Sequence, residues 1–152
     1  MGFVKSGACL CGEITYRIVD RPLFTHACHC TNCHKLTGTS YWLSMFVLEK
    51  DFELLSGSPG LVHPPQQFGT ANRFFCTDCG CAVYATHSMF EKIILPVPGT
   101  FEDMDWFAPQ AHIYVKSKLS WVHLSDGAPQ FQEYYNIEEV WPKESLERLH
   151  AA

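Results

Sequence analysis

Three cysteines lie within six residues in the stretch CHCTNC, which covers residues 28–33. The spacing Cys-x-Cys-x-x-Cys lets three thiolates reach one metal ion, whereas zinc in structural protein sites takes four ligands. Three protein ligands with a fourth position left open are typical of catalytic zinc, because the open position lets the ion act as a Lewis acid. We therefore expect Cys28, Cys30 and Cys33 to form a catalytic zinc site whose fourth position accepts a substrate.

Two other arrangements would fill that fourth position from the protein itself. His29 or His34 could supply an imidazole nitrogen, and Cys81 could supply a further sulfur. Either ligand would close the coordination shell and make the site structural. The sequence alone leaves these alternatives open beside the catalytic one.

Two further cysteine pairs have the spacing of a structural zinc site. Cys76 and Cys79 form a knuckle of the type Cys-x-x-Cys-Gly, and Cys9 and Cys11 form a second half that is also followed by glycine. Glycine permits the turn that directs backbone N–H groups at the sulfur atoms. Four thiolates leave no open position, so this ion would join distant parts of the chain. Its contribution to the folding free energy reaches ~10 kcal/mol in small zinc modules.

Disulfide bonds are the alternative use of the eight cysteines. The amino terminus has no apolar run long enough for a secretory leader, so we expect a cytoplasmic, reducing location in which thiols stay free. One residue separates Cys9 from Cys11 and Cys28 from Cys30, and this spacing is poorly suited to a bridge within either pair. Metal ligation is therefore the favoured interpretation.

The composition excludes several classes of protein. Of the 152 residues, 47% are apolar and 18% are charged, which is typical of a globular chain, and we expect residues 1–152 to form a single domain. A formal net charge of -5 offers no basic face for nucleic acid. No segment approaches the ~20 apolar residues of a membrane span. We expect neither nucleic acid nor a membrane as a partner.

The elements that must position the cysteines are mostly strands. Short runs rich in β-branched and aromatic residues lie between closely spaced glycines and prolines, a pattern typical of a mostly β protein. The segment Lys143–His150, which follows Pro142, is the one with a helical pattern. Residues 56–70 are the longest expected loop. Strands are expected at residues 13–19, 41–48, 52–55, 73–75, 82–85, 92–95 and 112–115.

The cysteines and the glycines beside them form one ordered series along the chain. The series reads Gly7-x-Cys9-x-Cys11-Gly12, then Cys28-His29-Cys30-x-x-Cys33 with Thr37-Gly38, then Phe75-Cys76-x-x-Cys79-Gly80. It resembles the glutathione-dependent formaldehyde-activating (GFA) enzyme family, also called the centromere protein V/GFA domain. Residues 98–103, 109–113 and 118–121 are similar to the family's C-terminal half, so the resemblance covers about residues 3 to 134. Cys81 lies outside the family's usual pattern.

The resemblance implies a fold, two metal sites and a reaction. The fold would be a β-tent of short antiparallel strands with a short C-terminal helix. One zinc ion would be structural and match the set Cys9, Cys11, Cys76 and Cys79, and a catalytic zinc would match Cys28, Cys30 and Cys33. The reaction is the addition of glutathione to formaldehyde, which gives S-hydroxymethylglutathione; in reverse it is a carbon–sulfur lyase.

An acidic chain must also accommodate the two carboxylates of glutathione. Lys35 and Arg73 lie beside the cysteine groups in the sequence, and we propose them as partners for those carboxylates; the alternative is that both are ordinary solvated charges. A zinc-stabilised β-tent module or chaperone without catalytic activity is the alternative, but it leaves the residue 28–33 triplet unexplained. Iron in a rubredoxin-like four-cysteine site and a reductase with Cys81 as its reactive thiol are further alternatives.

Overall fold

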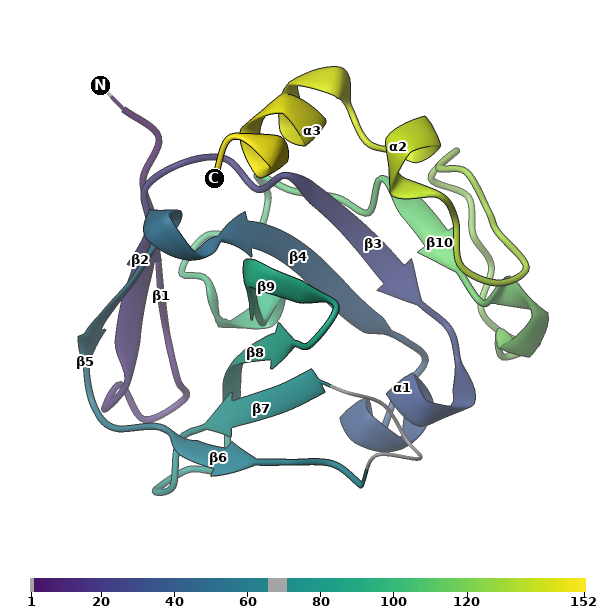
Figure 1. The fold of residues 1–152 in the computed structure, drawn as a ribbon. Coiled ribbons are helices and arrows are strands. Elements are labelled where there is room, and N and C mark those ends of the chain that lie inside the picture. The colour runs from purple at the N-terminus through teal and green to yellow at the C-terminus, as the bar shows by residue number, and fades with distance from the viewer. Residues whose placement is uncertain (1, 66–70) are drawn as a thin grey trace.

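The computed structural model describes residues 2–65 and 71–152 and consists mainly of short strands arranged in two sheets (Figure 1). In the described part of the chain, an antiparallel sheet of three strands has the order β1-β2-β5. A sheet of seven strands has the order β10-β3-β4-β9-β8-β7-β6, in which the β10–β3 pair is parallel and the other pairs are antiparallel.

The strands have these bounds: β1 Lys5–Ala8, β2 Thr15–Ile18, β3 Phe24–Cys28, β4 Trp42–Leu48, β5 Phe52–Ser56, β6 Gly60–Val62, β7 Ala71–Phe75, β8 Ala82–His87, β9 Phe90–Pro96 and β10 Ala111–Ile113. The α-helices are α1 Thr31–Thr37, α2 Ile137–Val140 and α3 Lys143–His150, and the 3-10 turns are η1 Glu49–Asp51, η3 Pro98–Thr100 and η4 Val115–Ser117. The expected mostly β class with a C-terminal helix is confirmed, and α3 has the predicted bounds.

Two expectations about local structure were wrong. Lys143–His150 is not the only helix, because α1 and α2 also form. Neither has a buried residue, so no apolar periodicity marks it in the sequence; α2 is recognisable mainly by its cap, the Asn136 side chain, which accepts from Glu138 N–H. The expected loop at 56–70 is interrupted by β6, and its residues 66–70 lie outside the described residues.

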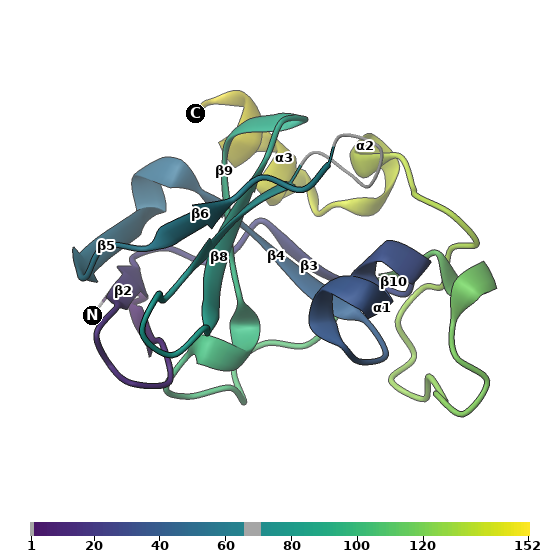
Figure 2. The ribbon, with the colours of Figure 1, turned by 90° about the horizontal axis from the view of Figure 1, so that it is seen from below.

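Two hydrophobic clusters fill the interior. One lies between β3, β4, β9 and the C-terminal helices and contains Phe24, Phe46 and Trp141. In Figure 2, α2 and α3 lie along one side of this sheet. The other cluster lies between the two sheets, with Tyr16 and Val83 fully buried. Gly7 is required there, because a Cβ at this position would come within 2.4 Å of the Tyr16 ring.

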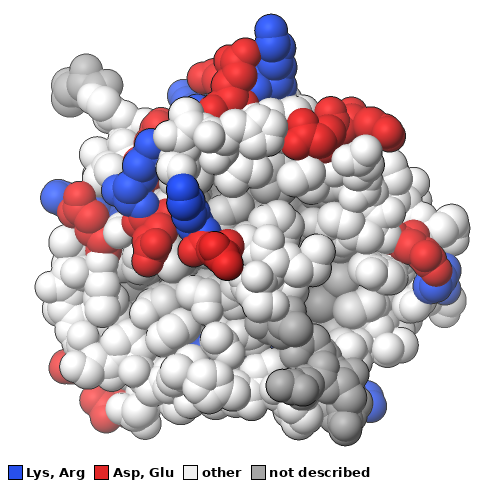
Figure 3. Space-filling model, viewed as in Figure 1, with Lys and Arg blue, Asp and Glu red and all other residues white. Residues whose placement is uncertain are grey.

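Charged side chains of both signs are interspersed on the surface. On the face in Figure 3 they lie mainly along the upper part and the edges, and much of the centre is uncharged. None of the helices in the described residues has the length and apolar composition of a membrane span.

Candidate functional site

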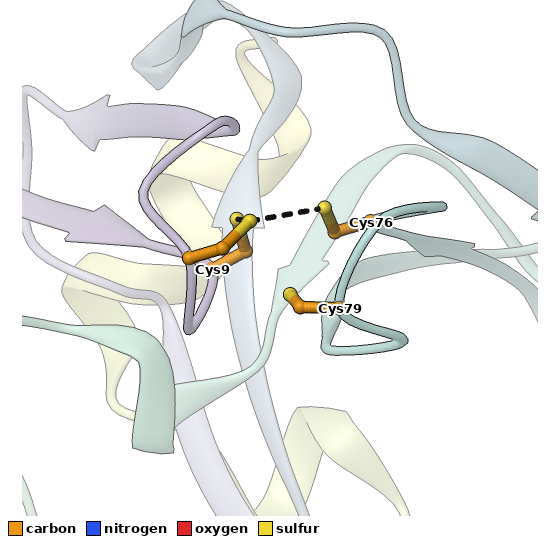
Figure 4. Close-up of side chains that lie close together, drawn as sticks. Cys9, Cys76 and Cys79 are labelled. Atoms are coloured by element: carbon orange, nitrogen blue, oxygen red, sulfur yellow. Dashed lines mark hydrogen bonds between the residues drawn. The ribbon is translucent and has the colours of Figure 1, made fainter.

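The predicted four-cysteine group is assembled from two turns that are far apart in the sequence. Cys9 and Cys11 lie in the turn between β1 and β2, and Cys76 and Cys79 lie in the knuckle between β7 and β8. In Figure 4 the side chains of Cys9, Cys76 and Cys79 reach toward one another from these separate turns. The four sulfur atoms all lie within 4.8 Å of one another. The group thus joins the two sheets.

The geometry of this group fits a tetrahedral ion. The sulfur atoms of Cys9 and Cys11 are 3.5 Å apart, and those of Cys11 and Cys76 are 3.6 Å apart. Four sulfurs at the usual zinc–sulfur distance of about 2.3 Å would be separated by roughly 3.8 Å. A disulfide would need about 2.05 Å, and all eight cysteines are free.

Backbone N–H groups stabilise the sulfur atoms of this group, as the glycine pattern predicts. Ile14 N–H donates to Cys9 Sγ at 3.2 Å. Gly80, with φ 73°, closes the knuckle through its N–H bond to Cys76 O. Hydrogen bonds, first from the backbone at Cys81, lower the pKa of the Cys79 thiol to about 6. A thiolate is therefore favoured there.

The triplet is built from the end of one strand and the start of one helix. Cys28 is the last residue of β3, and Cys30 is the N-cap of α1, its sulfur accepting from Cys33 N–H at 3.4 Å. Gly38 ends the helix with φ 69°, a left-handed conformation that glycine adopts without strain. The three sulfur atoms lie within 4.8 Å of one another.

The three thiols differ in their tendency to ionise. Hydrogen bonds from Cys28, then Cys33, and from nearby N–H groups lower the pKa of the Cys30 thiol to about 2. The hydrogen bond with Cys30, followed by burial, raises the pKa of Cys28 to about 12. The pKa of Cys33 is also raised, first by Cys28. One sulfur is thus favoured as a thiolate and its neighbours donate to it.

Neither alternative for closing the triplet is found in the described part of the chain. No histidine nitrogen or carboxylate oxygen among those residues joins the three sulfur atoms. Cys81 lies instead beside the four-cysteine group, where the charges of Cys79, Cys9 and Cys76 add to the effect of burial in raising its pKa. Cys81 is not a member of either group.

His29 is committed to a buried chain of hydrogen bonds. Its Nε2 is 3.0 Å from His112 Nδ1, and His112 Nε2 is 2.7 Å from a carboxylate oxygen of Asp126. The carboxylate accepts from His112 Nε2–H, so His112 Nδ1 accepts in turn from His29 Nε2–H. The remaining nitrogen, His29 Nδ1, is buried and has no hydrogen-bond partner among the residues described. His112 is therefore a buried support for His29.

The triplet opens onto a cleft of about 550 Å³. Most of its walls are aromatic or aliphatic, including Trp42 and Phe46 of β4, Phe90 of β9, and Tyr114 and Tyr134 from the C-terminal segment. Tyr114 has φ 53°, which makes it the one residue other than glycine with a positive φ in the described chain. Strained backbone of this kind is commonly retained at functional sites.

The hydrogen bonds of His26, a residue in the wall of the cleft, indicate which of its ring nitrogens carries the proton. Trp141 Nε1–H donates to the Tyr135 hydroxyl at 2.9 Å, and that hydroxyl lies 2.8 Å from His26 Nδ1. A hydroxyl that accepts from Trp141 still has its own O–H available for Nδ1, and that donation places the proton of the imidazole on Nε2. Burial lowers the pKa of His26 to about 3, so the ring is neutral near pH 7.

Of the two residues expected to bind carboxylates, Arg73 lines the cleft and Lys35 does not. Arg73 lines the cleft, with its guanidinium 5.7 Å from the Trp42 ring centroid and its Nη1 3.4 Å from Leu36 O. Burial lowers the pKa of Arg73, and the nearby Cys33 opposes this shift. Lys35 is exposed on α1 and is not among the residues that line the cleft.

Sequence reasoning found the seven cysteines but missed most of the cleft. His26 could have been found, since it lies two residues before Cys28 on one strand and therefore on the same face of the sheet. Tyr114, Tyr134 and Phe90 have no motif that marks them, because they reach the cleft from segments distant in sequence.

Comparison with known proteins places this geometry in context. A crystal structure of a Rhodobacter sphaeroides protein is similar in fold, with a TM-score of 0.52 and 16% sequence identity over 83% of this chain and 98% of that chain. A family model described as glutathione-dependent formaldehyde-activating enzyme matches residues 4–117, a span that includes every cysteine of both groups. The chain therefore belongs to the glutathione-dependent formaldehyde-activating enzyme family.

Proposed function

We propose that the protein is a zinc-dependent carbon–sulfur lyase that forms or cleaves the adduct of a thiol with a small aldehyde such as formaldehyde. The observation that carries this proposal is the contrast between the two cysteine groups. Four sulfurs form a closed set, whereas three sulfurs border a cleft of about 550 Å³ with no fourth described ligand. Family membership supports the same reaction class.

Cys9, Cys11, Cys76 and Cys79 would hold a structural zinc, and Cys28, Cys30 and Cys33 would hold the catalytic one. When bound by the triplet, zinc supplies a coordination position that favours a soft thiolate sulfur and lowers the pKa of the incoming thiol. The three ligands come from β3 and the first turn of α1, which are fixed by sheet pairing and by the Cys30 cap.

The reaction forms one carbon–sulfur bond and converts the carbonyl group into a hydroxyl group. The sulfur electron pair attacks the carbonyl carbon, the carbonyl electron pair moves to oxygen, and the thiol proton ends on that oxygen. His26 lies on the same strand face as Cys28, and its Nε2–H would donate a hydrogen bond to the oxygen as negative charge develops there. Tyr135 holds the imidazole in the tautomer that this donation requires.

Metal content in matched variants tests the division between the two sites. We expect two zinc ions per chain in the wild type, about one in a folded Cys33→Ser variant, and poor folding of Cys79→Ser. Equal loss of folding in both variants would show that the triplet is structural and would contradict the proposal.

Exchange NMR of thiol and formaldehyde mixtures tests the chemistry directly. Adduct formation is measured with and without protein across a panel of thiols that includes glutathione. We expect the wild type, but not Cys33→Ser, to accelerate formation and cleavage of at least one adduct. Rates that the protein leaves unchanged for every thiol would support a binding module without catalytic activity instead.

A further inference from the structure

The walls of the cleft have a chemical character that is poorly matched to glutathione. Formaldehyde has a single carbon atom, so most of a cleft of about 550 Å³ must accept the thiol partner. That volume lies in the usual range of small-molecule sites, in which apolar walls and a few polar groups fix the ligand. The composition of the walls therefore indicates which thiol fits.

Aromatic and aliphatic groups cover most of the cleft beyond the three sulfur atoms. Trp42 and Phe46 belong to one strand, Phe90 lies on the next, and Tyr114 and Tyr134 come from the segment after β10. Phe90 contacts Phe46 with ring centroids 5.3 Å apart, so these rings form a continuous surface. Rings arranged in this way favour a planar apolar group.

The positive charge in the lining of the cleft comes from a single side chain in the described chain. Arg73 is the one Lys or Arg among the described lining residues, and no Asp or Glu is among them. The guanidinium has five N–H donors and binds a carboxylate through two parallel bonds. One carboxylate can thus be neutralised in this cleft.

Glutathione has two carboxylates and an ammonium group, and it would need a second cation and an anion. Lys35 does not supply the cation, because it is exposed on α1 away from the described cleft lining. Burying an unpaired carboxylate is costly. The single Arg73 among aromatic walls matches a smaller molecule with one negative group and a planar body.

We infer that the preferred thiol is a small thiol that carries one aromatic ring and one carboxylate, not glutathione; this inference rests on the proposed function. Arg73 binds the carboxylate, the rings of Trp42, Phe46 and Phe90 contact the aromatic group, and the sulfur reaches the cysteine triplet. Arg73 Nη1 lies 3.4 Å from Leu36 O on α1, the helix that also carries Cys33, and both Arg73 and Cys33 line the cleft, so the carboxylate of the ligand is bound on the side of the cleft near the triplet.

Calorimetric binding to the purified, zinc-loaded protein tests this inference with three probes: 2-sulfanyl-3-phenylpropanoate, 2-phenylethanethiol and glutathione. We expect 2-sulfanyl-3-phenylpropanoate to bind at least about tenfold more tightly than glutathione. Arg73→Met should weaken that binding about tenfold and leave 2-phenylethanethiol unchanged, and Arg73→Lys should restore part of the loss. Lys35→Met is the matched control, since it also removes one cation but should change none of the three affinities.

Two results would overturn the inference. One is that glutathione binds as tightly as 2-sulfanyl-3-phenylpropanoate. The other is an equal loss of affinity for 2-sulfanyl-3-phenylpropanoate and 2-phenylethanethiol in Arg73→Met. If Arg73→Lys did not restore these affinities, Arg73 would have a structural role. Failure of the two proposals can be told apart by activity. Tight aromatic binding without faster adduct formation contradicts the lyase proposal alone, and acceleration confined to glutathione contradicts the thiol preference alone.

Discussion

The Tyr135 hydroxyl contributes both to the stability of the core and to the choice of the ring nitrogen of His26 that carries the proton. Tyr135→Phe removes one oxygen atom and leaves the ring in place beside Phe24. Two buried nitrogens then lose their partner: Trp141 Nε1, 2.9 Å from the hydroxyl, and His26 Nδ1, 2.8 Å from it. Both residues are less than 5% exposed, at 4% and 3%.

The cost follows from the number of groups left without a partner. A buried polar group without a hydrogen bond costs about 1–3 kcal/mol. Trp141 Nε1–H can only donate, so it loses the whole free energy of its hydrogen bond. His26 can change its tautomer and so recover part of the free energy that it loses. We expect Tyr135→Phe to lower the free energy of unfolding by about 3 kcal/mol, a large share of the about 5–15 kcal/mol of a typical domain.

Urea unfolding followed by both fluorescence and circular dichroism measures this change, with the zinc concentration fixed because metal binding adds to apparent stability. Tyr84→Phe is the matched control. The Tyr84 hydroxyl makes no hydrogen bond within the described part of the chain, while its ring stacks on Phe74 at 4.3 Å. We expect that variant to change stability by less than about 0.5 kcal/mol.

Long-range nitrogen NMR of the imidazoles supplies a second measurement on the same variant. The wild-type spectrum should show His26 protonated on Nε2, and Tyr135→Phe should shift the population toward the Nδ1–H form. Equal stabilities of Tyr135→Phe and the wild type, or a wild-type His26 protonated on Nδ1, would refute the reasoning.

Three other changes test separate parts of the structure. Gly7→Ala should destabilise the protein by about 1–3 kcal/mol or more through overpacking against Tyr16, whereas Gly99→Ala, where a Cβ meets nothing within 4 Å, should not; thermal unfolding compares the two. Cys81→Ser should leave the metal content at two ions per chain by elemental analysis, because Cys81 belongs to neither cysteine group; a loss of one ion would contradict the assignment. Chelation with excess EDTA should lower the melting temperature strongly, since ligand geometry and folding are linked, and added zinc should reverse the loss. An unchanged melting temperature after complete metal removal would contradict a structural role for the four-cysteine group.

Local sequence patterns were sufficient to predict the strands and the helix in which apolar residues recur at a regular spacing. The strand β4 was expected at 41–48 and found at Trp42–Leu48, and α3 was found at its predicted bounds. The strand β3 was missed because all five of its residues are buried, which removes the alternation that marks a half-buried strand. The structure brings the seven cysteines together in the two expected groups, and the fixed spacing of the knuckle and the triplet is the pattern that allowed this expectation.

Tertiary contacts determine two features of the site that local sequence patterns do not predict, namely the position of Cys81 and the role of Tyr135. The exclusion of Cys81 from the triplet follows from the pairing of β7 with β8, which places it beside Cys76, and Cys76 N–H donates to Cys81 O at 2.9 Å. The role of Tyr135 depends on the docking of α2 and α3 against β3, where Ser145 donates to the O of Leu23, the residue just before β3. Neither arrangement leaves a periodic signal in the sequence.

The two cysteine groups also differ in when a growing polypeptide can complete them. The triplet is finished once residue 33 has been made, but Cys11 and Cys76 are 65 residues apart. At about 5–20 residues per second, synthesis reaches Cys79 roughly 2–9 s after Cys33. The triplet is therefore available to a metal while the chain is still on the ribosome. Filling of the other group marks a polypeptide whose two sheets have already come together.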